Sequence, residues 1–473
     1  MLGWSDLDAF VVRYPFTAKQ METAQREWNG YGAPSIELRT GIHERVHLAS
    51  ALSTWGGLTR QLREVQAILV TTSIDDLRSR GRAVRPPIFE QMMGRDGTDL
   101  GRFSAALWFY IERTLAREEN SVDHVMAVAD NDIGALFPVH LSPEVVFRLC
   151  AGLLAGDDSV GDLALLLQNH APHAVEVEQR QELLAQALKV ALGDAQSTIG
   201  VQESLALASE YLYSPHEQIR QLASSQGDRE SGPYLTPLWR TAQSVGLDEP
   251  SDTLFTHIVC CDAALMPPVV LLDRRPGVTP ELPQILPGIR LMEIQMALGR
   301  LSLPAFSQED PEGTEEAMRK IFADLDWVSP DSSAHRWRVA SGGQPAQTRH
   351  ERMMRVAAQF RFAKKPILWN PGMFLRAPKE LLPYIFQIDY PIIQFDDRTF
   401  YHKDKEYVEE IELEYGWGRW LRQLFLFGDG PIELPWRATR GLTQDLAEAC
   451  SMRMSVAIDM PNAPMPQFVP LRS

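Results

Sequence analysis

Apolar residues recur at helical spacing along most of the chain, and this pattern predicts a largely helical protein. The clearest helical patterns cover residues 17–28, 58–77, 103–118, 143–155, 162–168, 178–192, 201–212, 291–301, 315–325 and 350–360. A Gly-, Pro- and Arg-rich stretch at residues 78–101 predicts a loop. At residues 214–217, Ser-Pro-His-Glu matches a capping box with Pro at the first helical position and predicts another helix start.

Alternating polar and apolar residues predict a smaller β component. Residues 35–39 alternate like a short strand, and residues 390–395 and 399–402 are predicted strands that flank a turn at 396–398. The predicted fold class is therefore α+β, predominantly α-helical, with a small antiparallel β element in a mixed C-terminal region. A polar stretch at 224–237 is the best candidate for a boundary, so we expect regions at 1–228 and 229–473.

The most informative helix is predicted to start after Thr40, a suitable N-cap residue, and to end at Gly56-Gly57. Most of its positions are apolar, which indicates a buried element. The polar or small residues His43, His47, Ser50 and Thr54 instead follow one stripe along the helix. This pattern is typical of a helix that presents ligands beside a cleft.

Within that stripe lies the sequence His-Glu-x-x-His, from His43 to His47. Histidines four residues apart share one helix face and can bind a single metal ion. Glu44 follows the first histidine and can reach a water on that metal as a general base. Because Zn²⁺ makes water acidic enough to react near neutral pH, the motif predicts a zinc-dependent hydrolase, with a metallopeptidase as the leading hypothesis.

These residues resemble the zincin metallopeptidases, and among them the gluzincin type, in which a glutamate on a second helix completes the zinc site. The extension that marks metzincins is absent, because Ser50 and Ser53 occupy its Gly and His positions. The resemblance implies a zincin-like catalytic region at 1–228, Zn²⁺ as the cofactor, and a peptide or protein substrate.

Two glutamates are candidates for the third zinc ligand. Glu64 follows the Gly-Gly break. Glu203 lies on the helix predicted at 201–212, on the same stripe as Ala206 and Glu210. The small residue between two carboxylates allows close approach to the motif helix, so Glu203 leads and Glu64 is the alternative. Glu210 is a candidate to accept a hydrogen bond from the protonated ring nitrogen of a ligating histidine.

The remaining candidates around the site come from residue type and sequence position. Oxyanion stabilisation commonly uses Tyr, His or Arg, and Tyr211, Tyr213 and His216 are close in sequence to the proposed ligand helix. Four histidines could replace Glu203 as a ligand: His124, His140, His170 and His173.

Composition narrows the classes of partner. The chain has 473 residues, of which 45% are hydrophobic and 23% charged, and its net charge is -16. This acidic balance argues against nucleic-acid and anionic-membrane partners, which need clustered Lys and Arg. The N-terminus lacks a signal-peptide pattern, four scattered cysteines suggest no disulfide framework, and residues 254–272 are too interrupted to span a membrane. We therefore expect a cytoplasmic protein.

Two alternatives use the same motif. One is a catalytically inactive, zincin-like interaction or scaffold protein, and the other is a metal-dependent hydrolase of a non-peptide amide or ester. The sequence leaves the substrate, the role of the C-terminal region and the oligomeric state open.

Overall fold

The structure is a computed structural model of the full chain, and its described part is mostly helical. The residues it describes are 4–6, 11–28, 34–53, 65–66, 69–70, 72–85, 87–95, 97–112, 198–212, 214–224, 232–265, 287–327 and 392–401. The predicted helical predominance is confirmed. Among the described residues, no helix has the length and apolar character needed to cross a membrane.

The chain divides into two compact units. One contains residues 1–65 and 109–401, and the other contains residues 66–108 and 402–473. The motif helix and the candidate ligand helix both belong to the first unit.

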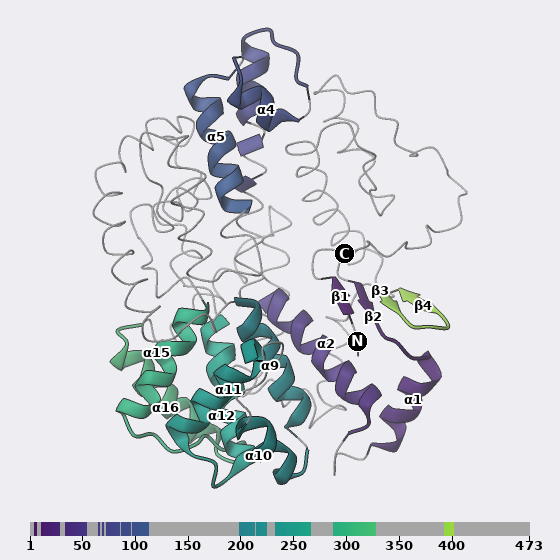
Figure 1. The fold of residues 1–473 in the computed structure, drawn as a ribbon, viewed down its shortest axis with the longest axis vertical. Helices are drawn as coiled ribbons and strands as arrows, with labels where there is room; N and C mark the ends of the chain where they lie inside the picture. Colours follow the sequence, from purple (N-terminus) through teal and green to yellow (C-terminus); the bar gives the residue numbers. More distant parts are fainter. Residues whose placement is uncertain are drawn as a thin grey trace, which may run out of the picture. The chain divides into compact units, whose positions relative to one another are not determined.

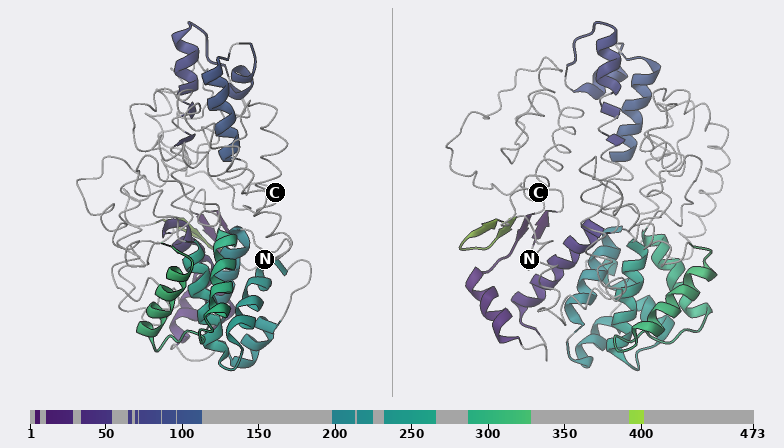
Figure 2. Two further views of the ribbon diagram at one scale, coloured as in Figure 1. Left: turned by 90° about the vertical axis from the view of Figure 1, so that its left-hand side faces the viewer. Right: turned by 180° about the vertical axis from the view of Figure 1, so that it is seen from behind.

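A cluster of helices forms the core of the first unit (Figures 1 and 2). Helix α9 (Thr198–Tyr211) packs against α11 (Gly232–Val245), α12 (Pro250–Leu265) and α15 (Pro287–Arg300). Helices α10 (His216–Ser224) and α16 (Pro311–Asp324) complete the cluster. Almost every residue of α12 is buried, which explains why apolar residues occur around the whole helix rather than on one face. These contacts join residues on both sides of position 228, where we expected a division.

Helix α2 (Ile36–Ser53) carries the His-Glu-x-x-His motif and makes its most extensive contacts with α9. It begins earlier than predicted: the expected strand at 35–39 and the Thr40 cap are wrong. The carbonyl oxygen of Ser35 accepts from the Arg39 amide at 2.9 Å, and Thr40 is buried inside the helix. Five alternating residues fit the first turn of a helix as well as a strand, and Ser35 is itself a good N-cap residue.

Helix α1 (Ala18–Glu27) packs against α2. A capping box fixes its start, because Thr17 Oγ1 accepts from the Gln20 amide while the Gln20 side chain accepts from the Thr17 amide at 2.8 Å. Gly41 of α2 faces Met21 of α1 closely: a Cβ at Gly41 would lie 2.9 Å from the Met21 Cε. The glycine in the motif helix therefore permits close helix packing.

A small mixed sheet joins the two ends of the first unit. Its strands are β1 (Trp4–Asp6), β2 (Val11–Arg13), β3 (Ile392–Gln394) and β4 (Thr399–Tyr401), in that order. The β1–β2 and β3–β4 pairs are antiparallel, but β2 pairs with β3 in parallel. The expected antiparallel element of the C-terminal region is thus half of a mixed sheet, because the N-terminal strands add to its edge.

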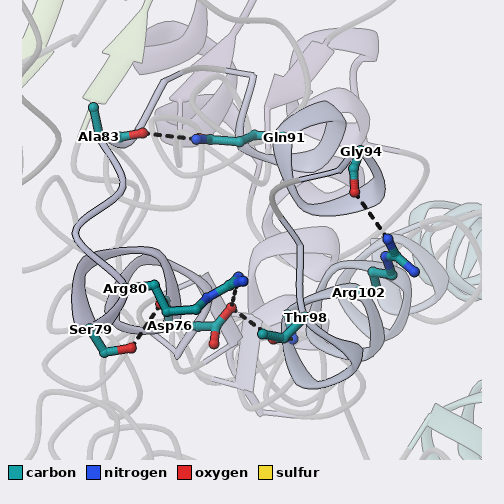
Figure 3. Close-up of polar contacts among 9 residues, drawn as sticks. Asp76, Ser79, Arg80, Ala83, Gln91, Gly94, Thr98 and Arg102 are labelled. Carbon is teal, nitrogen blue, oxygen red and sulfur yellow. Dashed lines mark hydrogen bonds and ion pairs between the residues drawn. The ribbon is translucent and has the colours of Figure 1, made fainter.

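The second unit contains a helical segment at 72–79, the short helix α4 (Ile88–Met93) and most of α5 (Asp99–Tyr110). The loop predicted over 78–101 is therefore wrong over α4 and the start of α5. Polar contacts order the connections between these helices (Figure 3). Asp76 accepts from Arg80 at 3.0 Å and from Thr98 at 2.8 Å, and Gln91 donates to the Ala83 carbonyl oxygen at 2.8 Å.

Other expected elements have mixed outcomes. Helix α10 begins at His216, one residue after the predicted first helical position, and Ser214 Oγ has no hydrogen-bond partner, so the expected capping box is not formed. Helix α11 runs through Pro237 and thus into the polar stretch that we expected to be a boundary. The helices predicted at 143–155, 162–168, 178–192 and 350–360 lie outside the described residues.

Candidate metal centre

Helix α2 places its two motif histidines against each other on one face. The His43 and His47 Nε2 atoms lie 3.1 Å apart, and their rings meet edge to face with centroids 4.8 Å apart. This proximity follows from the four-residue spacing on an α-helix. His47 is buried, whereas the side chain of His43 keeps 21% of its surface exposed.

Glu203 of α9 reaches both histidines. Its Oε2 lies 3.3 Å from His43 Nε2, and its Oε1 lies 3.3 Å from His47 Nε2. One ligand atom from each of the three residues lies within 4.8 Å of the other two. Among the described residues, His43, His47 and Glu203 form the one cluster of three or more His, Cys, Asp or Glu residues that could hold a metal ion. The structure therefore brings together the three residues that the sequence nominated as ligands.

Glu210 lies on the opposite side of the His43 ring from Glu203. Its Oε2 is 3.3 Å from His43 Nδ1, a buried nitrogen that makes no aligned hydrogen bond. Glu203 and Glu210 are seven residues apart on α9, so their side chains follow the same helix face. This is the location expected for a carboxylate that orients a ligating histidine.

The two carboxylates change the charge of His43. Burial alone lowers the pKa of this imidazole, but the neighbouring Glu203 and Glu210 outweigh burial and raise it to about 10. Burial raises the pKa of Glu203, yet His43 and His47 outweigh that effect and hold it well below its usual value. Without a metal, His43 and Glu203 thus form a charged pair at neutral pH.

Glu44 follows His43 in α2 and is only 4% exposed. Its negative charge is close enough to contribute to the raised pKa of His43. A buried carboxylate beside the ligand cluster is what a general base in this position requires.

Tyr211 lies at the end of α9, and its ring faces a residue that sequence reasoning missed. The Arg39 guanidinium carbon lies 5.3 Å from the centre of the Tyr211 ring, within the range of a cation–π contact. Arg39 precedes His43 by four residues, so extending the motif stripe by one turn towards the N-terminus would have found it. The mistaken strand at 35–39 hid that signal.

The other candidates do not join the described site. Glu64, Tyr213 and the histidines at 124, 140, 170 and 173 lie outside the described residues. His216 is the exposed first residue of α10.

The donor set fits a borderline transition-metal ion such as Zn²⁺ better than Mg²⁺ or Ca²⁺. Two imidazole nitrogens and a carboxylate are a common zinc set, whereas Mg²⁺ and Ca²⁺ prefer oxygen ligands throughout. The surroundings of His43 Nδ1 also fit, because a ligand bond at Nε2 would place the ring proton on Nδ1, facing Glu210 at 3.3 Å.

Comparisons with known proteins add no relative: no family model matches the chain, and neither curated proteins nor solved structures give a match. The candidate site therefore rests on the motif and on the geometry of its own side chains.

Proposed function

We propose that this chain is a zinc-dependent hydrolase of the gluzincin-like zincin type, with peptide bonds as its substrate. The observation that supports this proposal most strongly is the convergence of Glu203 on both motif histidines at 3.3 Å, from a separate helix. A buried Glu44 beside the first histidine supplies the remaining group that hydrolysis needs.

Each residue has a distinct role in the proposed reaction. His43 and His47 would hold zinc through Nε2 and Glu203 through its carboxylate, while Glu210 would orient His43. Zinc in such a site polarises a carbonyl group and makes a nearby water more acidic. Glu44 accepts the proton of the attacking water and returns it to the leaving amine. Non-peptide amides and esters require the same groups, so the choice of peptides comes from the resemblance to zincins.

Two substitutions separate binding from catalysis. Purified protein is expected to contain about one equivalent of zinc, which His43→Ala should remove. Glu44→Gln should retain zinc but lower the hydrolysis of a fluorogenic peptide mixture by roughly 10²–10⁴-fold, because it removes the general base. Both variants are first checked for unchanged helix content by circular dichroism.

Two results would oppose the proposal. A folded wild-type protein that retains no zinc after exposure to a stoichiometric amount would exclude the metal centre. A zinc-loaded wild-type protein that cleaves neither peptides nor model amides and esters would exclude the enzyme and favour the metal-binding scaffold.

A further inference from the structure

A buried chain of hydrogen bonds lies directly behind the candidate metal ligand. Ser204 follows Glu203 in α9, but it is 1% exposed and points into the helical cluster. Its Oγ lies 2.8 Å from Nε2 of His257 in α12. Glu203, which contacts the two motif histidines, is therefore bonded directly to Ser204, whose side chain is held in the core.

The chain continues across two more helices. His257 Nδ1 lies 2.9 Å from Thr241 Oγ1 in α11. The Gln295 side-chain amide of α15 donates to Thr241 Oγ1 at 3.0 Å and to the Pro237 carbonyl oxygen at 2.8 Å. His257 and Thr241 are fully buried, and Gln295 is nearly so. One polar network therefore connects α9 with the three helices that pack around it.

His257 is neutral in this network, because complete burial lowers its pKa to about 3. A neutral imidazole has one N–H donor and one acceptor nitrogen, so it can pair with both flanking hydroxyl groups at once. Removing Ser204 would leave His257 Nε2 to the weakly hydrogen-bonding thiol of Cys261, whose Sγ lies 3.3 Å away. The network is consequently sensitive to the position of α9 relative to α11 and α12.

A second hydrolytic site at this pair is a poor explanation. Ser204 and His257 have the separation of a serine nucleophile and its base. However, both side chains are shielded from solvent, and a histidine with so low a pKa is a weak base at neutral pH. The geometry favours a role in placing α9.

We propose that His257 is a positioning residue for the metal centre: through Ser204 it fixes the rotation and height of α9, and thereby directs the Glu203 carboxylate at His43 and His47. The inference rests on the proposed function, because it requires Glu203 to be a metal ligand. Residues that support ligands from behind commonly change metal affinity by about 10- to 100-fold when they are substituted.

The test compares zinc affinity in the full-length protein, measured by competition with a chelating dye. Ser204→Ala and His257→Asn are each expected to weaken zinc binding by about 10- to 100-fold. Both variants should also shift the visible absorption of the Co²⁺-substituted protein, which reports the ligand geometry. Combining the two substitutions should weaken binding little more than either alone, because both act through the same contact.

A matched control separates positioning from general loss of stability. Thr253 lies one turn before His257 in α12 and is also buried, but its hydroxyl donates at 2.7 Å to the carbonyl oxygen of Gly246, which follows α11, and not to a residue of α9. Thr253→Val should lower the unfolding midpoint, yet leave zinc affinity within about twofold and the Co²⁺ spectrum unchanged.

The outcomes distinguish this inference from the proposed function. If the wild-type protein binds zinc and Ser204→Ala has the same zinc affinity and Co²⁺ spectrum, the positioning role is overturned. The proposed metal centre is then unaffected. Equal losses of affinity in Ser204→Ala and Thr253→Val would also overturn it, because the effect would then follow stability. Wild-type protein that binds no metal would overturn both.

Discussion

His43 lies between two carboxylates, and at the proposed zinc site this arrangement would set the cost of exchanging a proton for a metal ion. Glu203 and Glu210 each lie 3.3 Å from one of its ring nitrogens and keep the imidazole protonated at neutral pH. A metal ion binds the neutral imidazole. Binding at Nε2 must therefore displace a proton that the same two carboxylates help to retain.

The pH dependence of metal binding follows from this competition. The pKa of His43 in the metal-free protein is about 10, so at any lower pH metal binding releases the proton from His43. Apparent zinc affinity should rise about tenfold per pH unit between pH 6.5 and 8, with one proton released per zinc. Calorimetric titration in buffers of different ionisation enthalpy measures that proton. An affinity independent of pH over this range would contradict the charged His43–Glu203 pair.

Glu210 can be tested separately from the ligands. Glu210→Gln keeps the size of the side chain but removes the charge that faces His43 Nδ1. We expect zinc affinity to fall by about 10- to 100-fold, because the ligand is less well oriented and less basic. The exposed Glu217 of α10 provides the control: Glu217→Gln should leave the affinity unchanged. Equal zinc affinities of Glu210→Gln and Glu217→Gln would show that Glu210 does not support the site.

At the scale of secondary structure, local patterns predicted which residues share a helix face better than they predicted where the helices begin. The four-residue spacing of His43 and His47, and the stripe of Glu203 and Glu210, depend only on helix periodicity. The start of α2 depended on five residues that fit either a helix or a strand, and they form the first turn of the helix, with the Ser35 carbonyl oxygen accepting from the Arg39 amide. The Ser204–His257 contact joins residues distant in sequence, so no local pattern predicts it.

The end of helix α12 is held by a buried arginine. Arg290 donates through Nε to the Ala264 carbonyl oxygen at 2.8 Å and through Nη2 to that of Ala263 at 3.0 Å. Its guanidinium carbon lies 4.2 Å from the centre of the Trp327 ring. One planar group thus satisfies two carbonyls at the C-terminus of α12, the helix that carries His257.

Lysine should replace Arg290 poorly, because an ammonium group lacks the planar pair of donors and the stacking surface. Arg290→Lys is expected to lower the free energy of unfolding by about 2–3 kcal/mol, measured by urea titration with circular dichroism. Arg300 on the same helix pairs with Asp324 at the surface and is half exposed. Arg300→Lys should therefore leave the free energy of unfolding nearly unchanged. Similar losses in the two variants would argue against the capping role of Arg290.

In the first unit as a whole, the mixed sheet joins segments that are far apart in the chain. The Tyr14 amide donates to the Gln394 carbonyl oxygen at 2.9 Å, and the Asp396 amide donates to that of Phe16 at 3.1 Å. Asp397 Oδ1 accepts from the Ala18 amide at the start of α1 at 2.8 Å. The sequence did not predict these contacts, because strand pairing over such a separation leaves no periodic signal.

Truncation tests the importance of this connection. A chain that ends at residue 391 lacks β3 and β4, so β2 loses its parallel partner and α1 loses the Asp397 contact. Its thermal midpoint should fall by on the order of 5 °C, and proteases should cleave within residues 11–28 more readily. A chain that ends at residue 401 retains both strands and serves as the control. Equal stability of the two chains would show that the pairing is dispensable.

The contact between Ala18 and Asp397 also has a consequence for synthesis on the ribosome, because these residues are separated by 379 positions. At a synthesis rate of about 5–20 residues per second, roughly 20–80 s pass between the synthesis of β2 and that of its partner strand β3. Glu203 leaves the ribosome well before Asp397, so α2 and α9 can meet while the sheet is still incomplete. Newly made protein should therefore bring its proposed metal ligands together before residues 4–18 are protected from cellular proteases.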